Sequence, residues 1–223
     1  MSQTDSQSPP SSSPQTAPGR PTLPVNSRSA SDVLAEMQAM RSRDARWRDG
    51  RTFSLVYHDT DEHLQLLRDA YSLFLAENAL NPMAFPSLRK METDVVAMCS
   101  GLLGGDQQVV GSMTSGGTES LFLAVKTYRD LARATRRVRR PEMIVPATAH
   151  VAWFKASEYF GVRLRQLPLD DRLHADVSKL EAMINRRTVM ILGSAPEYPH
   201  GSIDPIAAMG EIAQRHGVPL HVD

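Results

Sequence analysis

The chain has 223 residues, with 25 basic and 25 acidic side chains, 41% hydrophobic residues and a single cysteine, Cys99. The balanced charge argues against a nucleic-acid or membrane-surface partner, and one cysteine excludes an intrachain disulfide and is typical of a reducing compartment. No apolar run approaches the roughly 18 residues of a membrane-spanning helix, and no basic-then-apolar signal pattern opens the chain. We therefore expect a cytoplasmic protein with no membrane span and no nucleic-acid partner.

Residues 1–30 are rich in serine, proline, glutamine and threonine and contain few apolar side chains. Such a segment cannot bury enough surface to offset the entropy lost on ordering. We expect a disordered tail, and a plain solvated segment is favoured over a regulatory or partner-binding one.

Residues 31–105 are expected to form an N-terminal helical segment that packs on the rest of the chain. Ser31 is the expected N-cap of its first helix, and apolar residues recur at helical spacing in each helix. The expected elements are a helix at 31–47, an extended stretch at 53–57, a helix that begins at 59–61 and ends before Asn81 and Pro82, and a helix at 87–103.

From residue 106 to residue 223, short apolar runs alternate with amphipathic stretches. This alternation is typical of an α/β fold with a mainly parallel sheet and helices on both faces. Asp204 and Pro205 are the expected N-cap and first residue of the last helix. The expected strands are 109–114, 142–146, 162–167, 188–193 and 218–222, and the expected helices are 119–135, 150–160, 176–185 and 205–216.

Polar segments follow several of these strands, and ligands of parallel sheets bind beyond the carboxyl ends of strands. The segments 115–118, 147–150 and 194–196 and the residue Asp223 should therefore converge on one rim. The first contains paired glycines directly before a helix, where free N–H groups can hold a phosphate or another anion. An ordinary strand–helix turn explains these glycines equally well.

His150 and Asp223 add further chemistry to this rim. A histidine can stack on a flat ring, and a carboxylate can pair with a protonated ring nitrogen. Together with the anion turn, they suit a phosphorylated aromatic cofactor, as one interpretation among several. His221 and Asp223 could instead form a metal pair, but no further ligand cluster accompanies them, so no metal site is expected.

A basic run lies along the helix at 119–135 and just past its end. Most of its members share one helix face, which could indicate nucleic-acid binding. The aromatic residues of single-strand binders are missing, so a solvated surface is favoured. The run consists of Lys126, Arg129, Arg133, Arg136, Arg137, Arg139 and Arg140.

Five motifs occur between residues 81 and 223: NPMAFPSLRKMETDVV at 81–96, SGGTES at 115–120, TAHVAWFKASEYFGV at 148–162, GSAPEYPHGSID at 193–204 and HVD at 221–223. In this order they resemble the pyridoxal-phosphate-dependent group II decarboxylase family. Within that family, the likeness is greatest to the lyases of phosphorylated sphingoid bases. The resemblance covers about residues 53–223.

This resemblance implies a type I pyridoxal-phosphate-dependent transferase fold, pyridoxal 5'-phosphate as cofactor, a small-molecule amino substrate and a homodimer with active sites at its interface. It also implies roles for matching residues, of which His150 and Asp223 would be catalytic. In the segment of Tyr57, Leu55 after Ser54 departs from the family's Gly-Ala pattern. By the resemblance, Ser115, Gly116, Gly117 and Thr118 would hold the phosphate, His150 would stack on the pyridine ring, Asp223 would bind the ring nitrogen, Ser194 would lie near the cofactor, and Tyr57 would face the substrate.

The family holds its cofactor as a Schiff base with a lysine that follows the matching aspartate, and the four lysines here lie upstream of Asp223. We therefore expect a fragment, truncated before the C-terminal domain, that shows no turnover by itself. The favoured activity is a pyridoxal-phosphate-dependent carbon–carbon lyase that cleaves a bond to Cα of an amino substrate. An amino-acid decarboxylase of the same family and a catalytically inactive binding or regulatory protein remain alternatives.

Overall fold

The computed structural model describes residues 22–52 and 55–223. Two compact units make up the chain, one up to Ala76 and the other from Glu77 to Asp223. Most of the expected tail, and Phe53 and Ser54 of the expected extended stretch, lie outside the described residues. The domain boundaries expected at residues 30 and 105 stay predictions.

The first unit contains short helices that begin at hydroxyl caps. Helix α1 (Ala30–Met40) follows Ser29, whose hydroxyl accepts the N–H of Asp32 at 3.1 Å, so the expected cap at Ser31 was wrong. Closely spaced serines offer the same cap chemistry, and only the geometry of the first turn selects one of them. The helix also ends earlier than expected, at Met40, and no residue of it is buried. The remaining elements are η1 (Arg41–Arg43), η2 (Trp47–Asp49) and α2 (Asp61–Leu73), which Thr60 caps.

The second unit is built on a four-stranded parallel sheet in the order β2-β1-β3-β4. The two central strands are buried along their whole length, as their continuous apolar runs predict. The expected parallel α/β sheet is therefore confirmed. The strands are β1 (Glu142–Pro146), β2 (Arg163–Leu167), β3 (Thr188–Gly193) and β4 (Leu220–Val222).

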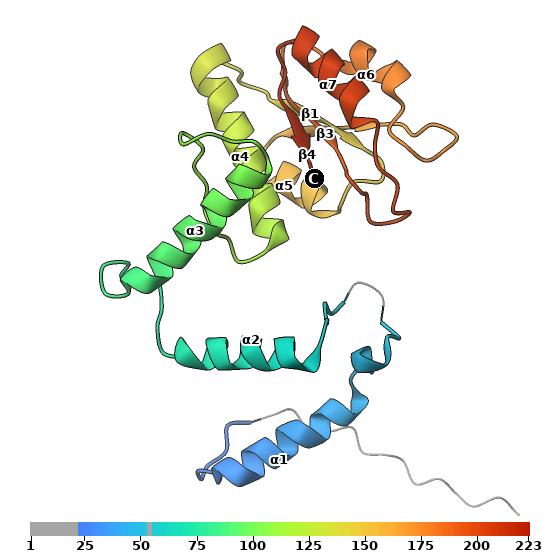
Figure 1. The fold of residues 1–223 in the computed structure, drawn as a ribbon. Helices are drawn as coiled ribbons and strands as arrows, with labels where there is room; N and C mark the ends of the chain where they lie inside the picture. Colours follow the sequence, from blue (N-terminus) through green and yellow to red (C-terminus); the bar gives the residue numbers. More distant parts are fainter. Residues whose placement is uncertain (1–21, 53–54) are drawn as a thin grey trace, which may run out of the picture. The chain divides into compact units, whose positions relative to one another are not determined.

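Helices cover both faces of this sheet (Figure 1), and successive strand residues pack on opposite sides. Met143 and Val145 pack beneath α4 and α5, where Trp153 is fully buried. Ile144 and Ile191 pack beneath α6 and α7. These helices are α4 (Gly117–Arg136), α5 (Ala152–Phe160), α6 (Val177–Met183) and α7 (Ile206–Arg215).

The expected strand at residues 109–114 was wrong, because this segment has no regular structure. It runs along α3 (Pro86–Leu102), and a Cβ added to Gly111 would lie 3.0 Å from a methyl group of Val96. A strand needs a neighbour to satisfy its backbone groups, and no described strand pairs with this segment. Val110 is consequently 89% exposed.

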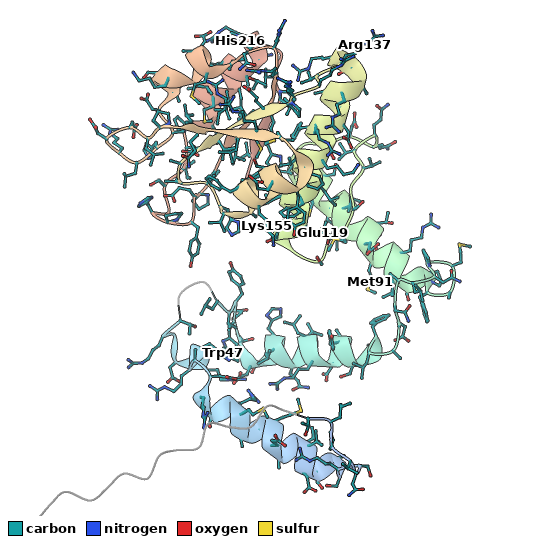
Figure 2. The ribbon with its side chains drawn as sticks, turned by 180° about the vertical axis from the view of Figure 1, so that it is seen from behind. Trp47, Met91, Glu119, Arg137, Lys155 and His216 are labelled. Atoms are coloured by element: carbon teal, nitrogen blue, oxygen red, sulfur yellow. The ribbon has the colours of Figure 1, made fainter. Side chains whose placement is uncertain are left out.

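Part of the basic run on α4 is used within the unit. Lys126 forms an ion pair with Asp130 at 2.8 Å, and Arg129 and Arg136 donate to the carbonyl oxygens of Phe160 and Thr188. Hydrogen bonds from Arg129 and then Lys126 hold the pKa of Asp130 far below its usual range. Figure 2 labels Arg137, which is exposed at the carboxyl end of α4. Among the described residues, no helix has the length and apolar character needed to cross a bilayer.

Candidate functional site

A cavity of about 600 Å³ lies at the carboxyl edge of the sheet, beyond the ends of β3 and β4 and beside the amino ends of α4 and α5. Segments far apart in the sequence form its walls. Five of the eight residues to which the resemblance gives a site role line this one cavity, namely Gly117, Thr118, His150, Ser194 and Asp223. Their roles toward a ligand stay predictions, but they are close enough together to contact one small molecule.

The turn before α4 presents free backbone donors to this cavity. No side chain caps the helix, so its first N–H groups lack the partner that a cap would supply. Gly116 has a φ of +156° and a ψ of 177°, a backbone conformation that is essentially restricted to glycine. Gly117 and Thr118 line the cavity, whereas Ser115 and Gly116 shape the turn behind them.

Hydrogen bonds within the turn fix its conformation. The N–H of Ser115 donates to Oε2 of Glu119 at 2.6 Å, and the hydroxyl oxygens of Thr114 and Ser120 lie 2.7 Å apart. Hydrogen bonds from the side chain and then the backbone of Ser115 hold the pKa of the Glu119 carboxyl below its ordinary value. Figure 2 shows Glu119 at this end of α4. The conformation of the turn is therefore fixed, and its use as an anion site stays a prediction.

His150 stands at the amino end of α5 with its ring exposed. Its Nδ1 accepts the N–H of Ala152 at 3.2 Å, which requires a lone pair on that nitrogen. The ring is thereby held in one orientation at the cavity, and its stacking on a ligand stays a prediction.

Asp223 follows β4 and is anchored through its backbone to the end of β3. Its N–H donates to the carbonyl oxygen of Gly193 at 2.9 Å, and its own carbonyl oxygen accepts the N–H of Ala195 at 2.7 Å. Its carboxylate Oδ2 accepts the indole N–H of Trp153 at 2.9 Å. The backbone of Asp223 and one oxygen of its carboxylate are therefore held in place.

Ser194 is buried, and Asp204 holds its backbone in place. Oδ2 of Asp204 accepts the N–H of Ser194 at 2.8 Å, and Oδ1 accepts the N–H of Ala175 at 2.9 Å. The expected N-cap role of Asp204 was wrong, because Pro205 occupies the cap position of α7 without a side-chain hydrogen bond. The carboxylate is used instead to join two chain segments behind the cavity.

Glu197 is a cavity residue that sequence reasoning missed. Its carboxylate is buried and accepts the N–H groups of His200 and Ser202, and it also contacts Nδ1 of His200 at 3.0 Å. Burial raises the pKa of this carboxyl, but the hydrogen bonds and the His200 ring outweigh burial and leave the pKa below its ordinary value. The motif at 193–204 was a signal for a loop near the site, but nothing in it indicated a buried charge.

Tyr57 belongs to the first unit and is 95% exposed there. Its expected role toward a substrate stays a prediction.

The lining fits the phosphate and the ring of pyridoxal phosphate. The amino end of α4 supplies donors for a phosphate, His150 supplies a flat ring, and Asp223 supplies a carboxylate for a ring nitrogen. No lysine lines the cavity, and Lys155 instead lies over the ring of Tyr159 at 5.7 Å. The residues present therefore suit non-covalent binding of the cofactor.

Comparisons with known proteins agree with this chemistry. The family model described as the pyridoxal-dependent decarboxylase conserved domain matches residues 22–223. The chain is 42% identical over 204 residues to sphingosine-1-phosphate lyase of Dictyostelium discoideum, covering 91% of this chain and 38% of that protein. It is 33% identical over 192 residues to a probable L-aspartate decarboxylase of Pyrococcus furiosus, covering 86% of this chain and 50% of that protein.

Solved structures show the same relationship. Sphingosine-1-phosphate lyase of Burkholderia pseudomallei superposes with a TM-score of 0.86 at 38% identity, covering 92% of this chain and 49% of that chain. Glutamate decarboxylase of Lactobacillus brevis, at 21% identity and a TM-score of 0.76, shares the fold. The chain thus spans half or less of each of these proteins.

Proposed function

The chain belongs to the pyridoxal-dependent decarboxylase family, whose cofactor is pyridoxal 5'-phosphate, and we propose that it contributes to a carbon–carbon lyase activity on a phosphorylated, long-chain amino substrate. One observation carries the proposal: a single cavity gathers the uncapped amino end of α4, His150 and Asp223. These groups match a phosphate, an aromatic ring and a ring nitrogen in turn.

Each residue has a role that its position supports. Gly117 and Thr118 would hold the phosphate through their backbone N–H groups, because the helix dipole favours an anion there. His150 would lie against the ring, and Ser194 would line the site beside it. Asp223 would keep a proton on the ring nitrogen, because a neighbouring negative charge favours the protonated form.

When bound, pyridoxal phosphate supplies a ring that accepts the electrons of a broken bond to the α-carbon of an amino substrate. A protonated ring nitrogen makes this acceptance easier, so the charge of Asp223 is the protein's contribution to that chemistry. The choice of a lyase rests on relatives named sphingosine-1-phosphate lyase at 42% and 38% identity. A homodimer and a cytoplasmic location are proposed with it.

The cofactor site is tested by titrating the chain with pyridoxal 5'-phosphate in a calorimeter. Gly116→Ala should weaken binding about tenfold, because a residue with a Cβ pays on the order of 1–2 kcal/mol at such a φ and the turn would shift. Gly161→Ala is the matched control, since Gly161 also has a positive φ, of +60°, with open space around it and no place in the cavity. Equal affinity in the two variants would contradict the phosphate site.

The reaction is tested on the native enzyme, supplied separately with a phosphorylated sphingoid base and with L-aspartate. Release of a long-chain aldehyde from the first supports the lyase. Release of carbon dioxide from the second supports the decarboxylase that the Pyrococcus furiosus relative suggests and would displace the proposal.

A further inference from the structure

Trp153 lies directly behind the carboxylate of Asp223. Its side chain is fully buried between α4, α5 and the sheet, and its indole N–H donates to Oδ2 of Asp223 at 2.9 Å. We propose that Trp153 is a positioning residue, which orients the Asp223 carboxylate toward a cofactor ring nitrogen in the cavity. This inference rests on the proposed function, because it assigns Asp223 to that nitrogen.

The geometry divides the two carboxylate oxygens between two tasks. Trp153 occupies Oδ2, and within the described residues Oδ1 has no hydrogen-bond partner. Because Asp223 lines the cavity, Oδ1 is the oxygen left for a ligand. The backbone of Asp223 is already paired with β3 through Gly193 and Ala195, so the indole fixes the remaining freedom of the side chain.

The donor is neutral, which preserves the charge of Asp223. An arginine or lysine in the place of Trp153 would compensate the negative charge that keeps a ring nitrogen protonated. Among the residues that the structure describes, no arginine or lysine lines the cavity. An indole N–H satisfies one oxygen without adding a positive charge, so the carboxylate keeps its charge for the ligand.

The ring of His221 packs against the indole, and the ring of Tyr128 packs against His221 in turn. The ring of His221 meets that of Trp153 at a centroid distance of 5.2 Å and an interplanar angle of 68°, and the ring of Tyr128 meets His221 at 5.9 Å and 84°. Burial lowers the pKa of His221, against the opposing effect of Asp223. The donor that the geometry assigns to Oδ2 is Trp153.

His150, which lies two residues before α5, is connected to this donor through the backbone. His150 and Trp153 are three residues apart, and the N–H of Trp153 donates to the carbonyl oxygen of His150 at 3.0 Å. Residues at this spacing lie on the same side of a helix turn. A shift of α5 would therefore move the ring of His150 and the carboxylate of Asp223 at the same time.

The test is a double-mutant cycle read by binding of pyridoxamine 5'-phosphate, which has no aldehyde and requires no lysine. Trp153→Phe removes the donor but keeps an aromatic ring, and it should weaken binding about tenfold, as expected for loss of a hydrogen bond to a charged group. Asp223→Ala should weaken it at least as much. The double variant should bind no more weakly than Asp223→Ala alone, because Trp153 acts through Asp223.

Trp47→Phe is the matched control, because Trp47 is the only other tryptophan of the chain and its ring contacts His58 in the first unit. It should leave binding unchanged. If Trp153→Phe also binds normally, or if the losses in the double variant multiply, the positioning role is overturned and the cofactor site stands. Absence of binding to the unsubstituted chain would instead overturn the proposed cofactor site and the role of Trp153 with it.

A second measurement needs no ligand and leaves Trp153 itself unsubstituted. The two indole N–H groups give two resonances in a ¹H–¹⁵N spectrum, and Trp47→Phe assigns them. Asp223→Ala should move the Trp153 indole proton upfield and leave that of Trp47 in place. An unmoved Trp153 resonance would show that the bond to Asp223 does not exist and would overturn the inference.

Discussion

Replacing Asp204 by alanine should destabilise the second unit strongly, although Asp204 does not line the cavity. The side chain is 2% exposed and accepts the N–H groups of two buried residues, Ser194 and Ala175. An unsatisfied buried donor costs about 1–3 kcal/mol. The free energy of unfolding should therefore fall by about 3–5 kcal/mol, whereas loss of an N-cap alone costs only about 1 kcal/mol.

The assay is urea unfolding followed by the fluorescence of Trp153 in a Trp47→Phe background, which reports the second unit alone. Asp176→Ala is the matched control, because Asp176 is a real N-cap that accepts the N–H of Ser178 at 3.0 Å. Asp204→Asn should fall between the two, since an amide retains one acceptor and adds a donor. The reasoning is refuted if Asp204→Ala costs no more than Asp176→Ala.

Two further predictions concern the loop and the sheet edge beside the cavity. Because the pKa of Glu197 in the folded chain lies below its ordinary value of 4.5, its contacts stabilise the fold above about pH 4.5 and lose this contribution as the pH falls through the folded pKa. The difference in urea midpoint between the unsubstituted chain and Glu197→Gln should therefore shrink below pH 4.5, and a constant difference would contradict this. Gly193→Ala should cost about 1–3 kcal/mol of unfolding free energy, because the added Cβ would lie 2.6 Å from Cδ1 of Ile206; an additional Ile206→Val change should recover part of the loss in the same urea assay.

The central part of the fold could be predicted because its signal is local. The strands β1 (Glu142–Pro146) and β3 (Thr188–Gly193) each contain a continuous apolar run, and both strands have the expected bounds. The segment at residues 109–114 contains fewer apolar residues and has no pairing partner among the described strands. A single segment can show the tendency to extend, but the partner that satisfies its backbone lies elsewhere in the chain.

The candidate site was predictable to the same extent. Gly117, His150 and Asp223 follow strands or open helices, so their meeting at one edge follows from the topology of a parallel sheet. The bond between Trp153 and Asp223 joins residues 70 positions apart, and an apolar helix face gives no sign that one of its members donates to a carboxylate. Asp204 was misassigned for the same reason, because its two partners lie 10 and 29 positions away.

The two aspartates that form hydrogen bonds near the end of β3 illustrate how a folded chain separates structural from chemical use of the same side chain. Asp204 is buried and gives both of its oxygens to backbone N–H groups, so it has none left for a ligand. Asp223 gives one oxygen to a neutral indole and lines the cavity. A residue that must act on a ring nitrogen needs both its charge and an accessible oxygen. Of the two carboxylates, only Asp223 meets both conditions. Asp204 instead holds the backbone of Ser194, which lines the cavity.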